Sequence, residues 1–506
     1  MTTTTEKVGA GKSSRISCAV RDLLDSAPGE RVESVAEAVA SAVDDAFSAP
    51  APLEWLIADV NDSDHSSDDL WNDTTGESRR SGIIRTYTES GVTGASQRSA
   101  ELEGLRITHK DNIGIAGYPL TAGTPALADH RAEMNSPLLT ASESAGGAII
   151  GANHMAEFAM SPTGHNHWLG DGVNPLNDAF LSGGSSSGSA ISVASGSSDL
   201  SLGTDTGGSV RLPAAFCGLV GYKPTNGIFS TTGLLPLSET LDTIGLLAAD
   251  AKTVRRVAEV LFSNSAVVDR DSRSRLEAHS GSDAFGFAHL SLPMVAENCD
   301  AEVTAAFSEA LTAIGQASDD GGIETGEDIS PGGDAGERRT LRATDFDDSE
   351  LNRRSVVIVS VEAARNVGRV LRWNWDLLGD QVLSRVIRGT AISAIEYADA
   401  LAQRAPLTEQ FLAEAMQGSR FMLTPTSPIL APKASTGDEA EVGRAESDYM
   451  RASRFTRIIN YLGLPAVTVP LPAIADSLSP GLQIIGRPYD DQALLDCAAR
   501  VAEACT

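Results

Sequence analysis

The sequence predicts an α/β fold, in which helices cover a central, partly parallel β-sheet. From residue 105 onward, short apolar runs typical of buried strands alternate with longer segments whose apolar residues recur at helical spacing. This alternation is typical of α/β domains. With 506 residues, 42% of them hydrophobic, the chain is long enough to bury a sizeable core. The strand-like runs are Leu105–Ile107, Gly147–Ile150, Leu219–Val220, Val356–Val361 and Ala466–Val469.

The first 98 residues differ from the rest, and we predict an N-terminal helical segment with a polar extension over 1–98 and the main domain over 99–506. Residues 1–20 have the composition of a disordered segment. A helix is expected over 31–48, because its apolar residues fall on one face. A short apolar element over 53–60 follows, and the polar stretch 61–98 predicts a loop or insertion.

Further helices are expected in the second half of the chain. An acidic, Gly-rich segment over 319–350 predicts a surface excursion before them. One helix is expected to include 362–375, and a second 394–404, ending before Pro406. A third is expected to restart at 408 and run to 416, and a fourth covers 490–504, close to the end of the sequence.

Charge and cysteine content exclude several classes of function. With 39 basic and 68 acidic residues, the net charge of −29 argues against binding nucleic acid or an anionic membrane. The five cysteines are scattered without a CxxC spacing, which argues against a disulfide framework or zinc site and fits a reducing cytosol. The start of the sequence lacks the apolar region of a signal peptide, and no apolar run reaches 18 residues. We therefore expect a cytoplasmic protein.

The chemistry is expected in the stretch 183–225, where nine glycines and ten serines alternate with apolar runs. Ser209 follows Gly207 and Gly208, and a turn built from two glycines can aim successive backbone N–H groups at one point, as an oxyanion hole requires. Serine needs a base, and this stretch contains no histidine, so a neutral lysine is the alternative. Of the six lysines, Lys110 stands at the end of a predicted strand, where burial is expected to lower its pKa.

Four separate regions carry motifs in a fixed order. The sequence GGSSSG at 183–188 is followed by GTDTGGSVRLPA at 203–214 and GYKPT at 221–225, while HKDN at 109–112 precedes them. LTPT at 423–426, NYLGLPAVTVP at 460–470 and GLQIIGRP at 481–488 complete the set. Over roughly residues 100–500 the chain therefore resembles the amidase signature family. The resemblance implies a large mixed, mostly parallel β-sheet flanked by helices on both faces.

The resemblance also implies roles for the motif residues. Ser209 corresponds to the nucleophile that forms an acyl-enzyme, Lys110 to the base, and Ser185 to a serine after a cis peptide bond that relays protons between them. Backbone N–H groups of Thr206, Gly207, Gly208 and Ser209 would form the oxyanion hole. No metal or organic cofactor is expected. Residues expected to support or flank this site are Met160 and Ser161 as substrate contacts, Asp205 and Arg211 as an ion pair bracing the turn, Lys223 as a local packing residue, and His165 and His167 as members of a loop near the substrate rather than metal ligands.

The expected activity is hydrolysis of a carboxamide C–N bond, releasing ammonia or an amine and a carboxylic acid. The expected partner is a small-molecule amide, with a possible homodimer and no nucleic acid or membrane. Two related enzymes remain open: the glutamine-hydrolysing A subunit of a tRNA-dependent amidotransferase, and a hydrolase of urea-like or carbamoyl substrates. A non-catalytic binding protein on the same scaffold is the alternative from another class.

Overall fold

The computed structural model describes residues 77–505, except 88–91, 97, 280–285, 320–340, 373, 435–447 and 449. In this part of the chain a single sheet of eleven strands has the order β1-β3-β2-β4-β6-β5-β10-β11-β9-β7-β8. The strands are β1 (Ile83–Thr86), β2 (Arg106–Lys110), β3 (Ala148–Asn153), β4 (Leu200–Asp205), β5 (Val220–Lys223), β6 (Thr243–Ala248), β7 (Phe287–Leu290), β8 (Arg342–Thr344), β9 (Phe421–Pro425), β10 (Ala466–Pro470) and β11 (Gly481–Ile485).

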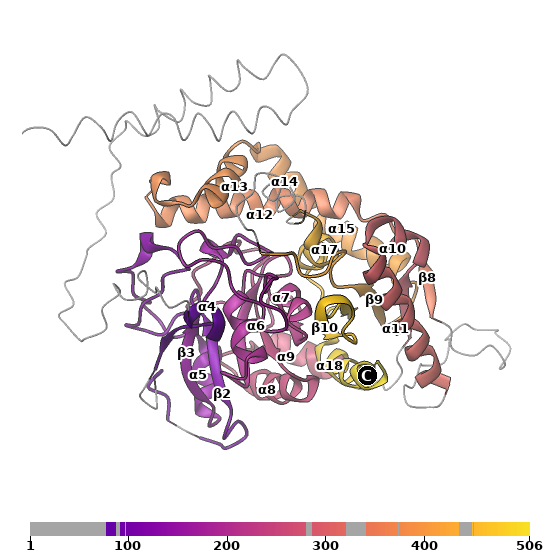
Figure 1. The fold of residues 1–506 in the computed structure, drawn as a ribbon, viewed down its shortest axis with the longest axis horizontal. Helices are drawn as coiled ribbons and strands as arrows, with labels where there is room; N and C mark the ends of the chain where they lie inside the picture. The colour runs from indigo at the N-terminus through magenta and orange to yellow at the C-terminus, as the bar shows by residue number, and fades with distance from the viewer. Residues whose placement is uncertain are drawn as a thin grey trace, which may run out of the picture.

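Helices separate many of these strands along the chain. They are α4 (Glu77–Ser81), α5 (Pro137–Ser144), α6 (Ser187–Ala194), α7 (Arg211–Phe216), α8 (Ala251–Ser263), α9 (Arg270–His279), α10 (Leu292–Asn298), α11 (Ala301–Asp319), α12 (Ser349–Val370), α13 (Asp380–Thr390), α14 (Ala394–Ala402), α15 (Arg404–Gln410), α17 (Arg454–Leu462) and α18 (Asp491–Ala504). The α12, α13 and α14 helices, drawn in orange, lie together along one side of the molecule (Figure 1).

The sheet is mixed, and its parallel pairs form two blocks. The β2 strand pairs in parallel with β3 and β4, and β7 pairs in parallel with β8 and β9. The helices α5 and α6 carry the chain back between β2, β3 and β4, which is the connection that parallel neighbours need. The strands between these blocks pair antiparallel. Because β2 and β4 run in the same direction, their last residues, Lys110 and Asp205, reach the same edge of the sheet.

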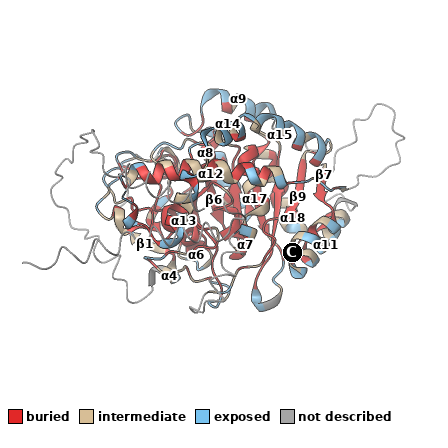
Figure 2. Cartoon of the chain, turned by 90° about the horizontal axis from the view of Figure 1, so that it is seen from above, coloured by how far each residue is buried: buried red, intermediate tan, exposed pale blue. Residues whose placement is uncertain are grey.

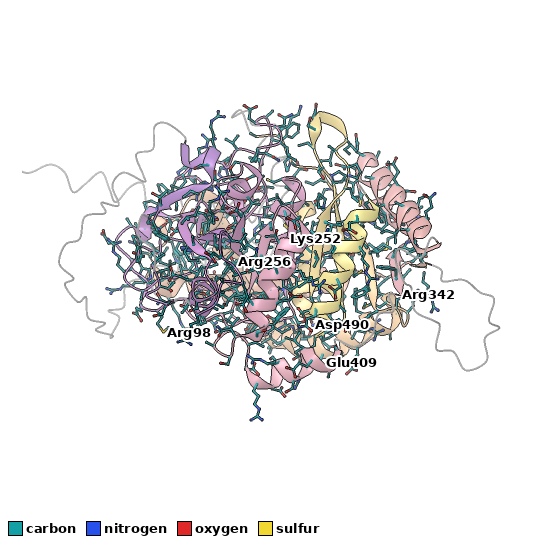
Figure 3. All side chains as sticks on the ribbon, turned by 90° about the horizontal axis from the view of Figure 1, so that it is seen from below. Arg98, Lys252, Arg256, Arg342, Glu409 and Asp490 are labelled. Carbon is teal, nitrogen blue, oxygen red and sulfur yellow. The ribbon has the colours of Figure 1, made fainter. Side chains whose placement is uncertain are left out.

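Helices cover both faces of the sheet. Successive residues of β6 point to opposite faces: Leu246 belongs to the core cluster that includes the buried side of α8, and Leu247 packs with residues of α6 and α7. Figure 2 shows the buried strands inside and the exposed outer surfaces of the helices. On its outer surface α8 carries charged residues, and Lys252 pairs with Glu503 of α18 at 3.0 Å (Figure 3). The predicted α/β class and the mixed, helix-flanked sheet are confirmed.

Several predicted elements are confirmed and three require correction. Strands β2, β3, β5 and β10 and helix α18 lie where the patterns predicted them. The helix expected to include 362–375 ends at Val370, and Arg372 has a positive φ of 51°, which a helix does not allow. The run 356–361, predicted as a strand, lies inside α12, because a short apolar run does not by itself distinguish a strand from a helix, and within this run only Ile358 is buried. The third helix starts at Arg404 rather than 408, because Pro406 is tolerated in the first turn of α15.

Some predictions lie outside the described residues. These are the disordered start, the helix over 31–48, the element over 53–60, most of the polar stretch 61–98 and Cys18. Within the acidic segment 319–350, residues 342–344 form the edge strand β8 and α12 begins at residue 349. The division of the chain between residues 98 and 99 stays a prediction.

Candidate active site

The side chain of Lys110, the last residue of β2, is fully buried at the carboxyl edge of the sheet. Its Nζ lies 2.7 Å from Ser185 Oγ and 2.7 Å from Thr204 Oγ1. Ser185 lies just before α6, and Thr204 belongs to the neighbouring strand β4. The parallel pairing of β2 with β4 therefore brings together residues that stand 75 and 94 positions apart from Lys110 in the sequence.

Burial lowers the pKa of Lys110 to about 7, because the charged amine loses its hydration in this setting. The carboxylates of Asp242 and Asp205 oppose that effect. No ion pair joins Lys110 to either carboxylate among the residues described. A substantial fraction of this amine is therefore uncharged at neutral pH, which is the state that can accept a proton.

The peptide bond between Gly184 and Ser185 is cis. Two backbone hydrogen bonds hold this segment, one from Gly184 N to Pro162 O at 2.9 Å and one from Ala156 N to Ser185 O at 3.1 Å. A Cβ on Gly184 would lie 2.5 Å from the carbonyl oxygen of Ser161, so only glycine fits here. The loop around 156–162 thus fixes the position of Ser185 opposite Lys110.

Asp205 organises the turn that leads to Ser209. Its fully buried carboxylate accepts hydrogen bonds from the Gly208 N–H at 2.8 Å and from the Arg211 guanidinium at 2.9 and 3.0 Å. Desolvation raises the pKa of Asp205, but the cation of Arg211 and its hydrogen bonds hold it well below the usual range. Asn460 of α17 donates to both the carboxylate and the backbone carbonyl of Asp205. The predicted brace between Asp205 and Arg211 is present.

This arrangement corrects the prediction that the Gly208 N–H serves an oxyanion hole, because that N–H already donates to Asp205. In the described part of the chain, the N–H groups of Thr206, Gly207 and Ser209 have no internal acceptor. Gly208 instead supplies the backbone shape, with a φ of +123° and Thr456 Oγ1 only 2.1 Å from where a Cβ would stand. The free donors of the turn are therefore three of the four that the sequence predicted.

Ser209 follows this turn and is 9% exposed. Its carbonyl oxygen accepts from Ser186 N at 3.2 Å, which ties the turn before Ser209 to the cis-peptide segment. Among the described residues, no hydrogen bond joins the hydroxyls of Ser209 and Ser185. Of the two contacts in the predicted relay, the one between Lys110 and Ser185 is therefore at hydrogen-bonding distance, and the one between Ser185 and Ser209 is not formed in this structure.

Asp242 lies on the other side of the turn. One oxygen accepts from Thr206 Oγ1 at 2.5 Å, and the other accepts the N–H groups of Leu237 and Ser238 at 2.9 and 3.0 Å. Desolvation raises the pKa of Asp242 to about 6, although these hydrogen bonds and the nearby Lys110 favour its charged form. Asp242 thus holds the hydroxyl of Thr206, and the backbone N–H of Thr206 is left for a ligand.

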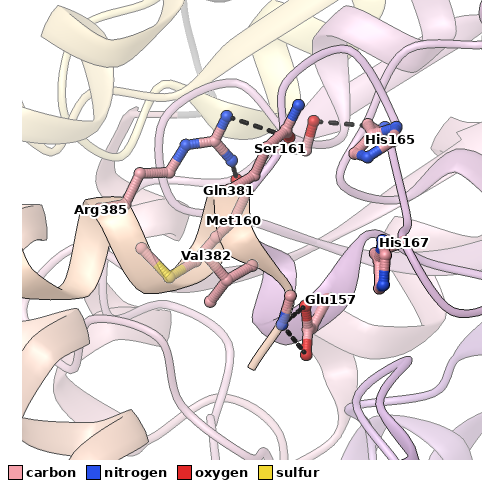
Figure 4. Close-up of a pocket in the computed structure, with 9 residues that line it drawn as sticks. Glu157, Met160, Ser161, His165, His167, Gln381, Val382 and Arg385 are labelled. Atoms are coloured by element: carbon pink, nitrogen blue, oxygen red, sulfur yellow. Dashed lines mark hydrogen bonds between the residues drawn. The ribbon is translucent and has the colours of Figure 1, made fainter. Parts of the chain in front are cut away.

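The predicted substrate contacts, Met160 and Ser161, are buried and line a narrow pocket (Figure 4). The α13 helix closes one side, where Arg385 donates to the Met160 carbonyl. The pocket has a cavity volume of about 10 Å³, which is roughly enough for one water molecule. The pocket lies beside the loop that supports Ser185 and is too small to hold an amide substrate as it stands.

Comparison with known proteins agrees with this geometry. The protein-family model described as amidase matches residues 85–495. The chain belongs to the amidase family. It is 31% identical to the A subunit of the glutamyl-tRNA(Gln) amidotransferase of Halobacterium salinarum, a match that covers 82% of this chain and 98% of that protein.

Two further matches widen the comparison for this amidase. An indoleacetamide hydrolase of Pseudomonas syringae is 43% identical over 168 residues, which are 32% of this chain and 37% of that protein. The crystal structure of the A subunit of the Thermotoga maritima glutamyl-tRNA(Gln) amidotransferase is 26% identical, with a TM-score of 0.63, and the match covers 87% of this chain and 89% of that one. The chain is thus an enzyme that acts on amide carbon–nitrogen bonds.

Sequence reasoning missed two residues of the amidase site. Thr204 accepts from the Lys110 amine, and Asp242 accepts from Thr206. Thr204 stands inside the motif at 203–214, so its position next to the last residue of a buried strand could have indicated a role. Asp242 stands in a loop without a motif, and only the antiparallel pairing of β4 with β6 brings it to the turn.

The other predicted residues, Lys223, His165 and His167, make contacts with neighbouring groups of the protein. Lys223 is buried and donates to the Pro224 carbonyl at 2.7 Å, as expected of a packing residue. His165 pairs with Asp171 at 2.6 Å, and His167 lines the pocket of Figure 4. Within the described ranges, no three His, Cys, Asp or Glu side chains cluster in a way that would hold a metal ion. No helix among the described residues has the length and apolar character needed to cross a membrane.

Proposed function

We propose that this amidase hydrolyses the C–N bond of a small carboxamide through an acyl-enzyme on Ser209. The observation that carries the proposal is the buried Lys110 amine, 2.7 Å from Ser185 Oγ and with its pKa lowered to about 7. A lysine in this state can act as a base at neutral pH. The adjacent turn presents a serine together with three backbone N–H groups that lack internal acceptors among the described residues.

The reaction follows from these positions. Neutral Lys110 takes the proton of Ser185, and Ser185 takes the proton of Ser209, whose Oγ attacks the amide carbonyl. The N–H groups of Thr206, Gly207 and Ser209 stabilise the oxyanion. The protonated relay then returns a proton to the leaving nitrogen, so that ammonia or an amine departs. Water attacks the ester by the same route, releases the carboxylic acid and restores Ser209.

The substrate we favour is a small primary amide, and the second candidate is glutamine. The likeness to the indoleacetamide hydrolase supports the primary amide, since that match has 43% identity over 168 residues, against 31% for the amidotransferase subunit over 448 residues. The likeness to the A subunit of the amidotransferase extends over 98% of that relative and supports the second. A homodimer, a partner protein and activity on urea-like or carbamoyl compounds stay predictions.

Ammonia release separates these candidates. Purified protein is assayed with aliphatic, aromatic and ureido amides and with glutamine, alone and after co-expression with neighbouring genes. Turnover of a simple amide by the chain alone supports the first candidate. Glutamine turnover that depends on a co-purifying protein supports the second.

Two substitutions test the roles of the site residues. Ser209→Ala should abolish turnover, and Lys110→Ala should lose most of it. The matched controls are Ser274→Ala on α9 and Lys252→Ala on α8, since both side chains are exposed and remote from the sheet edge. Wild-type turnover by folded Ser209→Ala or Lys110→Ala would contradict the assignment.

A further inference from the structure

A carboxylate on α12, Glu362, is 1% exposed, and its surroundings supply only neutral donors. It accepts hydrogen bonds from Ser238 Oγ at 2.5 Å, from Thr240 N at 3.1 Å and from Thr240 Oγ1 at 2.9 Å. The Tyr397 hydroxyl of α14 donates at 2.6 Å. Among the described residues no Arg, Lys or His forms an ion pair with Glu362.

Such a carboxylate is costly to bury, because it loses its hydration without a direct ion pair, and the Arg404 guanidinium interacts with it only at longer range, from the Thr240 carbonyl that it binds. The hydrogen bonds that Glu362 accepts must offset this cost, so their donors have to be held in fixed positions. Three of the four come from the loop 237–242, which precedes β6, and two other α12 side chains also contact this loop. Asn366 donates to the Leu237 carbonyl at 3.1 Å, and Arg365 pairs with Glu239. One side of α12 therefore fastens the loop.

The same loop reaches the nucleophile turn through Ser238. Its hydroxyl donates to Glu362, and its backbone N–H donates to Asp242 at 3.0 Å. Asp242 accepts in turn from the hydroxyl of Thr206, the residue that carries the first of the turn's three free N–H donors. Glu362 is thus linked to Thr206 by three hydrogen bonds. The Ser238 hydroxyl binds Glu362, the Ser238 backbone N–H binds Asp242, and Asp242 binds the Thr206 hydroxyl.

We propose that Glu362 is a positioning residue for the oxyanion turn. It does not touch the reacting atoms. By holding Ser238, it orients the Asp242 carboxylate, which fixes Thr206 and so the direction of the turn's N–H groups. The inference rests on the proposed acyl-enzyme function, because it concerns the step in which the oxyanion develops. Small displacements matter at this step, since a misplacement of about 1 Å can lower a rate on the order of 100-fold.

The test measures acylation of the enzyme by p-nitrophenyl acetate, a small ester that develops the same oxyanion. Glu362→Gln keeps the shape but replaces an acceptor oxygen with an amide nitrogen. Ser238→Ala removes the hydroxyl and keeps the backbone N–H that binds Asp242, so it breaks the series at one point and serves where Glu362→Gln folds poorly. We expect both variants to lower the acylation rate constant about tenfold or more, with KM changed by less than about twofold.

Two comparison variants separate positioning from stability. Tyr397→Phe removes a donor from the same carboxylate on the α14 side, and should cost less in acylation than Ser238→Ala. Arg353→Gln breaks an exposed ion pair on the same helix and should acylate at the wild-type rate. Rates are normalised to folded protein, and thermal unfolding is recorded for each variant.

Each outcome bears on one claim. Wild-type acylation rates in Glu362→Gln and Ser238→Ala, with only a lowered Tm, would overturn the positioning role. If Ser209→Ala is inert at the same time, the proposed function stands and this inference alone fails. If Ser209→Ala is acylated like the wild type, the acyl-enzyme proposal itself fails.

Discussion

The side-chain nitrogen of Lys110 lies 2.7 Å from Ser185 Oγ, in an environment that excludes water from both groups. One residue ends a central strand, and the other follows a cis peptide bond before α6. Because Lys110 can be neutral at pH 7 and Thr204 Oγ1 provides its second hydrogen bond, the amine is oriented toward Ser185. The predictions below follow from this pair and from the turn beside it.

The pH–rate profile should report Lys110. Because the neutral amine is the proposed base, kcat/KM should rise as pH increases through about 7, the pKa that burial gives this lysine. Burial lowers the pKa of the neighbouring His109 to about 4, so that imidazole stays neutral across the rise. Residual activity of Lys110→Met should lack the inflection.

The control for this profile is Lys223, the second buried lysine, whose pKa burial also lowers to about 7. Lys223→Met should keep the inflection if the variant folds, because Lys223 contacts the Pro224 carbonyl rather than Ser185. If Lys223→Met lost the inflection near pH 7 and Lys110→Met kept it, the inflection would belong to Lys223 rather than to Lys110.

Lys223 also makes stability depend on pH. Its pKa is about 7 in the folded chain and takes the ordinary value of 10.5 when unfolded, so between these values the unfolded state binds the extra proton. The free energy of unfolding should therefore rise with pH across this window, by at most about 1.4 kcal/mol per pH unit from this group. Urea unfolding of Lys223→Met should show a slope smaller by that amount, whereas parallel curves would refute the buried, uncharged state.

The buried ion pair of Asp205 and Arg211 should contribute strongly to stability. Arg211→Met removes the cation and leaves Asp205 buried, at an expected cost of about 3–5 kcal/mol in the free energy of unfolding. Turnover should fall as well, because Asp205 holds the Gly208 N–H and so the turn. Denaturant unfolding measures the first effect, and Arg353→Gln is the exposed control, expected to change stability by less than about 0.5 kcal/mol. A small loss in Arg211→Met would show that the turn does not depend on this pair.

The two glycines before Ser209 should respond differently to a methyl group. In Gly208→Ala the new Cβ meets Thr456 Oγ1 at 2.1 Å and the φ of +123° is unfavourable, so we expect a loss of about 1–3 kcal/mol and of most activity. In Gly207→Ala the nearest atom is Arg457 Cβ at 3.6 Å, an ordinary contact. That variant should keep its fold and its backbone donor. Equal behaviour of the two variants in thermal unfolding and turnover would contradict this geometry.

The motifs predicted the residues of the site better than they predicted the contacts among them. Lys110, Ser185 and Ser209 stand in short segments with distinctive glycine and serine spacing, and the structure places the first two within hydrogen-bonding distance. The use of the Gly208 N–H by Asp205 depends on the turn's backbone, which spacing alone does not define. Asp242 escaped prediction because its partner Thr206 stands after β4, and Glu362 because its partners stand in the loop 237–242 and in α14. Only the folded chain brings these segments together.

For the fold, too, local patterns predicted some elements correctly, while packing between distant segments decided others. Runs with strand spacing between clear turn signals, such as those of β2 and β10, were assigned correctly. The prediction for the run 356–361 is wrong, because tertiary packing stabilises a long helix even where it contains several β-branched residues, of which only Ile358 is buried here. Packing of α12 against α13 and α14 decides this case.

Covalent trapping of the nucleophile tests the central claim most directly. The protein is treated with a small alkyl fluorophosphonate, digested, and mapped by mass spectrometry. The account predicts one adduct, on Ser209, formed at a rate that increases as pH rises through about 7 and is greatly reduced in Lys110→Met. An adduct on another residue, or rapid labelling of Ser209 in folded Lys110→Met, would contradict it.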